Sequence, residues 1–268
     1  MERLEALFAS PDITRGIAVA ALVFARVVPI VMLVPAFGGR LVPGTVKVGI
    51  AAVFVMLLYP AVSAETAATL AIDLSFVVLV LKEVLVGVTI GFLVSIAFSA
   101  IESAGALIDT ARGATLVTAL VPELGTRDSV VADLKFQLAI VLFFAFGGHL
   151  LAISALIDTF NVFPVDRFPT TAGLGALADV TIRATSSLFV AAFSLAAPVW
   201  GAAVVADVLL ALLSRVAPQM NAFALGMPLK AVLGVFALLL ALSLITPRLI
   251  EMLVDAVRGI VFWVKLFL

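Results

Sequence analysis

The sequence predicts an all-α membrane protein with about six long apolar helices. Apolar residues make up 64% of the chain and charged residues 12%, with a mean hydropathy of +1.31. Soluble domains have about 45–50% apolar and about 25% charged residues. The apolar residues also gather into blocks close to the ~20 residues that an α-helix needs to cross a bilayer.

Six apolar blocks follow one another, and residues that break helices separate them. Glycines and prolines at positions 38–44 follow the first block, Pro60 lies near the end of the second, and Pro164 and Pro169 precede the fifth. We expect one helix per block. The blocks are residues 16–35, 46–62, 74–101, 138–157, 184–213 and 229–246.

The last piece of the chain, residues 247–268, is predicted to be an amphipathic tail. Charged side chains lie on or near one side of this helix, an arrangement suited to a membrane interface. They are Arg248, Glu251, Asp255, Arg258 and Lys265. We therefore expect one membrane domain over residues 1–268, ending in this tail.

Composition argues against several functions. A net charge of −1 offers no basic surface for nucleic acid, and the absence of cysteine excludes thiolate chemistry. His149, Ser154 and Asp158 have neither the spacing nor the loop of a hydrolytic triad. The glycine-rich run at 38–47 lacks the GK[ST] of a phosphate-binding loop. We expect no enzyme, with no catalytic residue, cofactor or metal.

Small residues recur at every fourth position of the third block and form one smooth helical stripe. Such a stripe allows another helix to approach closely. Two interpretations stay open: a partner helix from another subunit, or packing inside this chain. The stripe consists of Gly87, Gly91, Ser95, Ser99 and Ser103.

Four charged residues, Arg26, Lys82, Glu83 and Asp207, lie inside the apolar blocks. Each is costly to bury in lipid and should face protein or water. Pairing with one another or with partner chains is the favoured interpretation. The alternative is a secondary ion or solute transporter that uses them for coupling.

The connection at residues 102–137 holds eight charged residues between apolar blocks. It is longer than most helix connections, and its apolar content argues against disorder. Irregular backbone at membrane depth is tolerated where protein buries it or where it lines a cavity. The connection is therefore a candidate gate.

Three separated motifs resemble one known family. They are AGALIDTARGATLVTALVPE (104–123), FAFGGHLLAISALIDTF (144–160) and LLSRVAPQMNAFALGMPLK (212–230). In this order, and over nearly the whole chain, they resemble the FliR/SctT family of type III secretion export-gate membrane proteins, found in flagella and injectisomes. The IDTARGA run favours the injectisome branch over the flagellar branch.

The resemblance implies a multi-pass protein of the bacterial inner membrane whose helical hairpins join a helically arranged export gate. Its partners would be several copies of two sister membrane proteins, further export-apparatus proteins and secreted unfolded polypeptides. The assembled complex would lie partly above the bilayer plane. That placement fits an even count of seven Lys or Arg residues on each predicted side, which assigns no orientation.

The resemblance also implies a plug-like loop near residues 105–129, with 109–126 as the plug that closes the channel. Its candidate gate residues are Asp109, Arg112, Gly113, Val121, Pro122 and Glu123. Two other classes remain as alternatives. One is the transporter, and the other is a scaffold that seeds assembly of the sister proteins.

Overall fold

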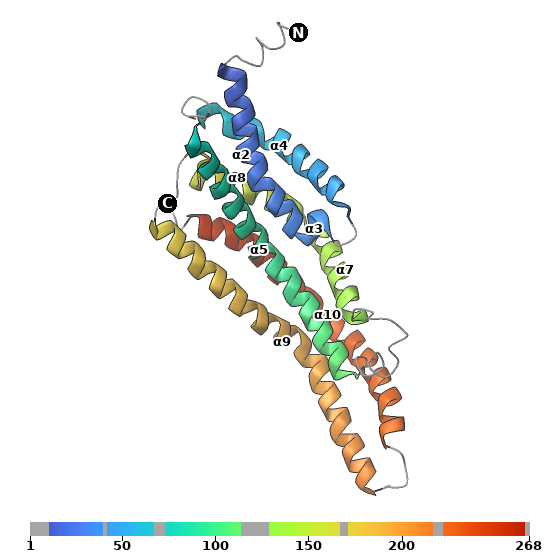
Figure 1. Cartoon of the computed structure of the whole chain (residues 1–268). Helices are drawn as coiled ribbons and strands as arrows, with labels where there is room; N and C mark the ends of the chain where they lie inside the picture. The colour runs from blue at the N-terminus through green and yellow to red at the C-terminus, as the bar shows by residue number, and fades with distance from the viewer. Residues whose placement is uncertain are drawn as a thin grey trace. The chain divides into compact units, whose positions relative to one another are not determined.

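The computed structural model describes residues 11–39, 42–66, 73–113, 129–166, 171–216 and 222–265, and every regular element in these ranges is an α-helix (Figure 1). The predicted all-α class is confirmed. The helices are α2 (Pro11–Leu33), α3 (Pro35–Gly38), α4 (Gly44–Thr66), α5 (Leu74–Ala111), α7 (Val130–Ala145), α8 (Gly148–Val162), α9 (Thr171–Val216) and α10 (Ala222–Lys265).

Five described segments are long and apolar enough to cross a membrane, and a bent helix pair makes a sixth if it is counted as one span. This agrees with the prediction of about six. The five segments are Ile13–Leu33, Gly44–Val62, Leu74–Ala111, Ala178–Val216 and Pro228–Gly259, and the bent pair is Val130–Ala145 with Gly148–Asn161.

The bent pair corresponds to the block predicted as one helix over 138–157. Between α7 and α8 the chain turns by 72°. Gly147 has a φ of 77° there, a left-handed conformation that glycine adopts without the steric penalty of a side chain. Two apolar helices separated by such a turn are either a broken span or a re-entrant hairpin.

Two other boundaries differ from the prediction. Helix α5 continues to Ala111, so residues 102–111 are helical rather than part of a connection. Helix α10 runs through Pro247 to Lys265, so the amphipathic tail continues the preceding span over its described residues. A proline removes only one helical hydrogen bond, and long apolar helices tolerate this loss.

Helix α5 begins just after Asp73, which lies outside the apolar segment. The Asp73 carboxylate accepts hydrogen bonds from the Ser75 hydroxyl and from the Ser75 backbone N–H, the latter at 2.9 Å. The hydroxyl contact, followed by the backbone contact, lowers the pKa of Asp73 below its ordinary value. A negative charge is therefore kept at the N-terminus of α5, where the helix dipole favours it.

The contacts divide the chain into two compact units. The first comprises Met1–Ser95, Gly147–Ala184 and Asp255–Leu268. Within it α2 packs along α4 and buries Leu22, Val23 and Val27 completely. The edge of Phe37 meets the Phe54 ring, with centroids 5.4 Å apart. This apolar core surrounds the few charged residues that the unit buries.

The second unit comprises Ile96–Phe146 and Thr185–Val254. In it the C-terminal half of α5 packs against α7. Phe98 meets Phe136 and Phe143 edge to face, with ring centroids 6.3 and 5.6 Å away. This aromatic contact and the one at Gly105 described below make α5 and α7 a hairpin whose connection begins after Gly113.

Candidate functional site

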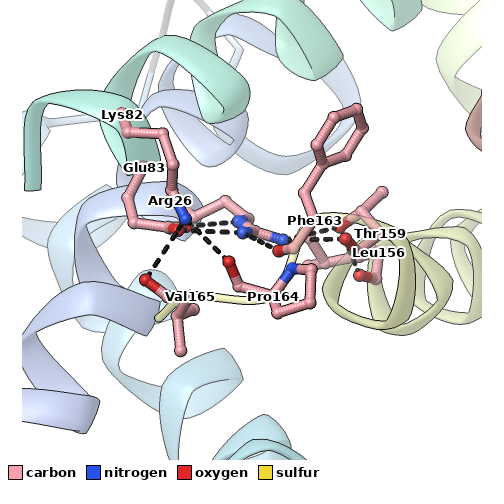
Figure 2. A network of polar contacts seen from close by, with 8 residues as sticks. All are labelled: Arg26, Lys82, Glu83, Leu156, Thr159, Phe163, Pro164 and Val165. Carbon is pink, nitrogen blue, oxygen red and sulfur yellow. Dashed lines mark hydrogen bonds and ion pairs between the residues drawn. The ribbon is translucent and has the colours of Figure 1, made fainter. Parts of the chain in front are cut away.

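A buried ion pair joins α2 to α5 in the first unit. Arg26 and Glu83 both have fully buried side chains, with 0% exposure. Arg26 Nε donates to Glu83 Oε2 at 2.5 Å, and Arg26 Nη2 donates to Oε1 at 3.0 Å (Figure 2). Two parallel charge-assisted hydrogen bonds fix both the distance and the orientation of the two side chains.

The same guanidinium holds the C-terminal end of α8. Arg26 Nη1 donates to the Thr159 carbonyl at 3.0 Å, and Nη2 donates to the Phe163 carbonyl at 2.6 Å. Its charged carbon also lies 4.0 Å from the centre of the Phe160 ring, close enough for a cation–π interaction. The last carbonyls of a helix lack intrahelical donors, so a cation at this position is doubly favourable.

Lys82 extends this network along the chain that follows α8. Its Nζ lies 2.6 Å from Glu83 Oε1 and donates to the carbonyls of Pro164 at 2.8 Å and Val165 at 3.2 Å (Figure 2). The three charged side chains thus fasten α2, α5 and α8 together. We call Arg26, Lys82 and Glu83 the buried charge network.

The four in-span charges each form an ion pair in the described part of the chain. Arg26, Lys82 and Glu83 pair within the buried charge network, and Asp207 of α9 forms an ion pair with Lys230 of α10 in the second unit. Asp207 is half exposed, at 51%. These four charged side chains are therefore occupied by structural contacts. No three His, Asp or Glu side chains gather as metal ligands in the described ranges.

A second polar cluster lies where α5 ends and α7 begins. Asp109 is 2% exposed, and its Oδ2 accepts hydrogen bonds from the Ser129 hydroxyl and from the Val131 N–H, the latter at 2.9 Å. Ser129 is the N-cap of α7, because its Oγ accepts the Ala132 N–H at 3.1 Å. The carboxylate therefore lies at the positive end of the α7 dipole. We call Asp109 and Ser129 the loop clamp.

Arg112 completes the clamp from the α5 side. Its Nη2 lies 3.1 Å from Asp109 Oδ1. Its aliphatic stem packs on Gly234 of α10, where an added Cβ would come within 2.3 Å of Arg112 Cγ. Gly113 has a φ of 76° and donates its N–H to the Thr110 carbonyl at 3.1 Å. Both ends of the segment 114–128 are therefore held close together.

The structure thus brings together Asp109 and Arg112, with Gly113 next in the chain, from the six predicted gate residues. Val121, Pro122 and Glu123 lie outside the described residues. Sequence reasoning missed Ser129, although a serine just before an apolar run is a recognised sign of an N-cap.

The small-residue stripe is partly used inside this chain. A Cβ at Gly87 would lie 2.2 Å from the Arg26 carbonyl oxygen, and one at Gly91 would lie 3.0 Å from Leu33 Cβ. Both glycines therefore let α5 approach α2 of the same chain. Ser95, Ser99 and Ser103 are half-buried, and a partner helix at these serines stays a prediction.

Replacing Gly87 by alanine should destabilise the protein by about 1–3 kcal/mol, because the new methyl group must displace backbone beside Arg26. Thermal unfolding of the purified protein in detergent measures the change. Gly201 in α9 is the matched control, since a Cβ there meets nothing within 4 Å and alanine stabilises a helix by about 1 kcal/mol over glycine. Equal effects at both positions would contradict the close approach.

Apolar helices of spanning length, the buried charge network, and a clamped connection between two helices define a multi-pass helical membrane protein. A family model supplies the particular family. The model described as bacterial export proteins, family 1, matches residues 17–256. The chain belongs to this family, and the predicted membership in the FliR/SctT family is confirmed.

Curated relatives come from both flagellar and translocation systems. The flagellar biosynthetic protein FliR of Pectobacterium carotovorum is 34% identical over 84% of each chain. The Yop proteins translocation protein T of Yersinia pestis is 32% identical over 83% of this chain and 85% of its own. The surface presentation of antigens protein SpaR of Salmonella typhimurium is 31% identical over 94% and 93%. Because these identities are so similar, they do not decide between the flagellar and the injectisome branch.

Proposed function

We propose that this protein is a component of the protein-conducting export gate of a type III secretion system and carries unfolded polypeptides across the bacterial inner membrane. Membership in a family of bacterial export proteins supports this role. Flagellar biosynthesis and protein translocation appear in the names of its relatives. The IDTARGA run at 108–114 remains our reason for favouring an injectisome over a flagellum.

The partners that we propose are several copies of two sister membrane proteins, together with further export-apparatus proteins. Large apolar side chains on α9 and α10 are exposed in the single chain, and they need either lipid or protein neighbours. Examples are Phe189 at 60%, Val205 at 60%, Phe236 at 59% and Leu244 at 68%. Co-purification of the sister proteins with a tagged chain tests this, and a chain active in transport alone would favour the transporter.

Helix lengths support an assembly that rises partly above the bilayer plane. Helices α5, α9 and α10 have 38, 46 and 44 residues. At ~1.5 Å per residue their lengths along the helix are about 57, 69 and 66 Å, roughly twice the ~30 Å of a bilayer core. About half of each helix therefore needs surroundings other than lipid tails.

The loop between α5 and α7 is the part that we propose closes the channel at rest. The observation that carries this proposal is the loop clamp. Asp109 accepts hydrogen bonds from Ser129 and Val131 across the base of the segment 114–128. A fixed base lets a loop occupy one place while its tip is displaced by a substrate. Asp207 and Lys230 are committed to each other, which weighs against ion coupling at that position.

Replacing residues 114–128 by a short Gly-Ser linker should raise the leakage of small solutes across the membrane of resting cells. The linker can join Gly113 to Ser129 because the loop clamp brings the two ends together. Dye uptake by cells whose only copy of the protein carries the linker measures the leak. The matched control is the native chain expressed in the same cells, and an unchanged uptake in the linker variant would contradict closure by this loop.

A further inference from the structure

Helix α10 has a glycine on its buried side, at the point where it meets the end of α5. Gly234 is buried, and the same side of the helix continues with Leu238, Ala241 and Ile245, which are 9%, 5% and 2% exposed. Spacings of four, three and four residues follow one stripe of an α-helix. Phe236, two residues after Gly234, is 59% exposed. Gly234 therefore belongs to the stripe that α10 turns toward the interior of the second unit.

The side chain of Arg112 fills the space that a larger residue at position 234 would need. A Cβ on Gly234 would lie 2.3 Å from Arg112 Cγ and 2.4 Å from Arg112 Cδ, whereas carbon atoms pack at about 3.5–4.0 Å. The backbone itself does not require glycine, because position 234 lies inside α10 and has no positive φ. Alanine is the better helix former at such a position. The contact with Arg112 is what accounts for a glycine here.

The position of the Arg112 stem decides where its guanidinium lies. Arg112 Nη2 is 3.1 Å from Asp109 Oδ1, and the Arg112 side chain is 14% exposed. Arginine has a long side chain with many rotamers, so an ion pair alone must order all of them. Packing the stem against α10 orders most of the side chain. Gly234 and Asp109 thus hold the two ends of one arginine.

We propose that Gly234 is a positioning residue of the loop clamp. By leaving room for the Arg112 stem, it keeps the guanidinium beside the Asp109 carboxylate. Asp109 in turn accepts from Ser129 and from the Val131 N–H at the start of α7. Helix α10 is therefore part of the device that fixes the base of segment 114–128, although it is remote from that segment in the sequence.

The consequence for export rests on the proposed function, in which the loop closes the channel. A change at Gly234 then opens the channel without altering the loop or α7. The opening is confined to the clamp, because α5 and α7 stay packed one turn away, where a Cβ on Gly105 would lie 2.3 Å from Ala132 Cα. Exchange of the Val131 amide hydrogen therefore reports the contact with Asp109 rather than separation of the two helices.

Replacing Gly234 by alanine tests the contact. The atoms in the way belong to a flexible side chain rather than to backbone, so Arg112 can turn aside while α10 stays in place. We expect native amounts in the membrane, but amide exchange at Val131 roughly tenfold faster, because the buried Asp109 loses its cation. Gly201→Ala in α9 is the matched control, since a Cβ there meets nothing within 4 Å. Exchange at Val131 as slow as in this control would overturn the proposal.

A double variant separates positioning from a merely structural role. Arg112→Ala removes both the stem that meets position 234 and the cation beside Asp109, so it should also speed exchange at Val131 roughly tenfold. Adding Gly234→Ala to Arg112→Ala should change nothing further, because the side chain that it would displace is gone. Independent effects would instead multiply to roughly 100-fold, and that product would overturn the proposal.

The same double variant covers poor folding. If Gly234→Ala reaches the membrane in reduced amounts, the second change Arg112→Ala should restore them, because it removes the obstacle to the new methyl group. Amounts that stay low in the double variant would show that position 234 acts through other neighbours, which overturns the proposal.

Dye uptake by resting cells distinguishes this proposal from closure by the loop. If Gly234→Ala speeds exchange at Val131 while neither it nor the linker variant of segment 114–128 leaks, the positioning role stands and closure by the loop fails. If the linker variant leaks while Gly234→Ala leaves exchange at Val131 unchanged, closure stands and the positioning role fails.

Discussion

Replacing Glu83 by glutamine is expected to destabilise the protein by about 3–5 kcal/mol, the usual result of removing one partner from a buried ion pair. The glutamine keeps the shape but not the charge, so Arg26 and Lys82 would lie a few ångströms apart without a counterion. This loss is a large part of the ~5–15 kcal/mol that stabilises a typical domain. We expect little of the variant in the membrane fraction and a much lower unfolding temperature for what remains.

The matched control is Glu251→Gln, which breaks the exposed Arg248–Glu251 pair on α10. Those side chains are 76% and 61% exposed, and exposed pairs contribute about 0–1 kcal/mol. Quantitative immunoblotting of membranes and thermal unfolding in detergent compare the two variants. If Glu83→Gln accumulates and unfolds like Glu251→Gln, the buried charge network does not hold the first unit together.

Replacing Asp109 by alanine is expected to open the loop clamp and leave the rest of the protein folded. The change removes the acceptor for the buried Val131 N–H and leaves Arg112 without its carboxylate partner. Each unsatisfied buried group costs about 1–3 kcal/mol. A local loss of about 3 kcal/mol corresponds to an opening equilibrium shifted roughly 100-fold.

Two measurements check this result. Amide exchange at Val131 should be roughly 100-fold faster in Asp109→Ala, which reports the clamp directly. Resting leakage should rise toward that of the linker variant. Asp133→Ala is the control, because it removes an exposed acid from the same first turn of α7 and costs at most about 1 kcal/mol. If the Asp109→Ala variant leaks no more than the Asp133→Ala variant, opening the loop clamp does not open the channel.

The spans could be predicted because they depend on composition. Apolar blocks of membrane length are visible in any single sequence, and five of the six predicted blocks correspond to continuous helical spans, the first of which ends at Leu33 rather than at residue 35. Their ends could not be predicted so well. Residues 102–111 are mixed in character, and α5 continues through them because Gly105 packs on α7 and Asp109 finds its partners there. Those contacts come from distant parts of the chain.

The turn at Gly147 was missed for a different reason. The residues on both sides of it are as apolar as those of an unbroken span, so hydropathy gives no sign of a 72° bend. The local signal was the pair of glycines at 147 and 148. A left-handed φ at Gly147 is a conformational fact that a hydropathy profile does not record.

The charged residues of the candidate site could be recognised in the sequence, but their partners could not be predicted from it. Arg26 and Glu83 were recognisable as costly charges inside apolar blocks, yet they lie 57 residues apart. The carbonyls of Thr159 and Phe163 that accept from Arg26 leave no trace in the sequence, because every residue carries a carbonyl. Pairing is a property of tertiary structure, and the packing of α2, α5 and α8 decides it.

Electrical recording from the purified gate in a planar bilayer tests the central claim most directly. The native chain, assembled with its sister proteins, should hold a resting conductance close to that of the bare bilayer. The assembly in which a Gly-Ser linker replaces residues 114–128 should conduct steadily without any substrate. An assembly with the linker that stays as closed as the native one would contradict the account, as would a native assembly that conducts freely at rest.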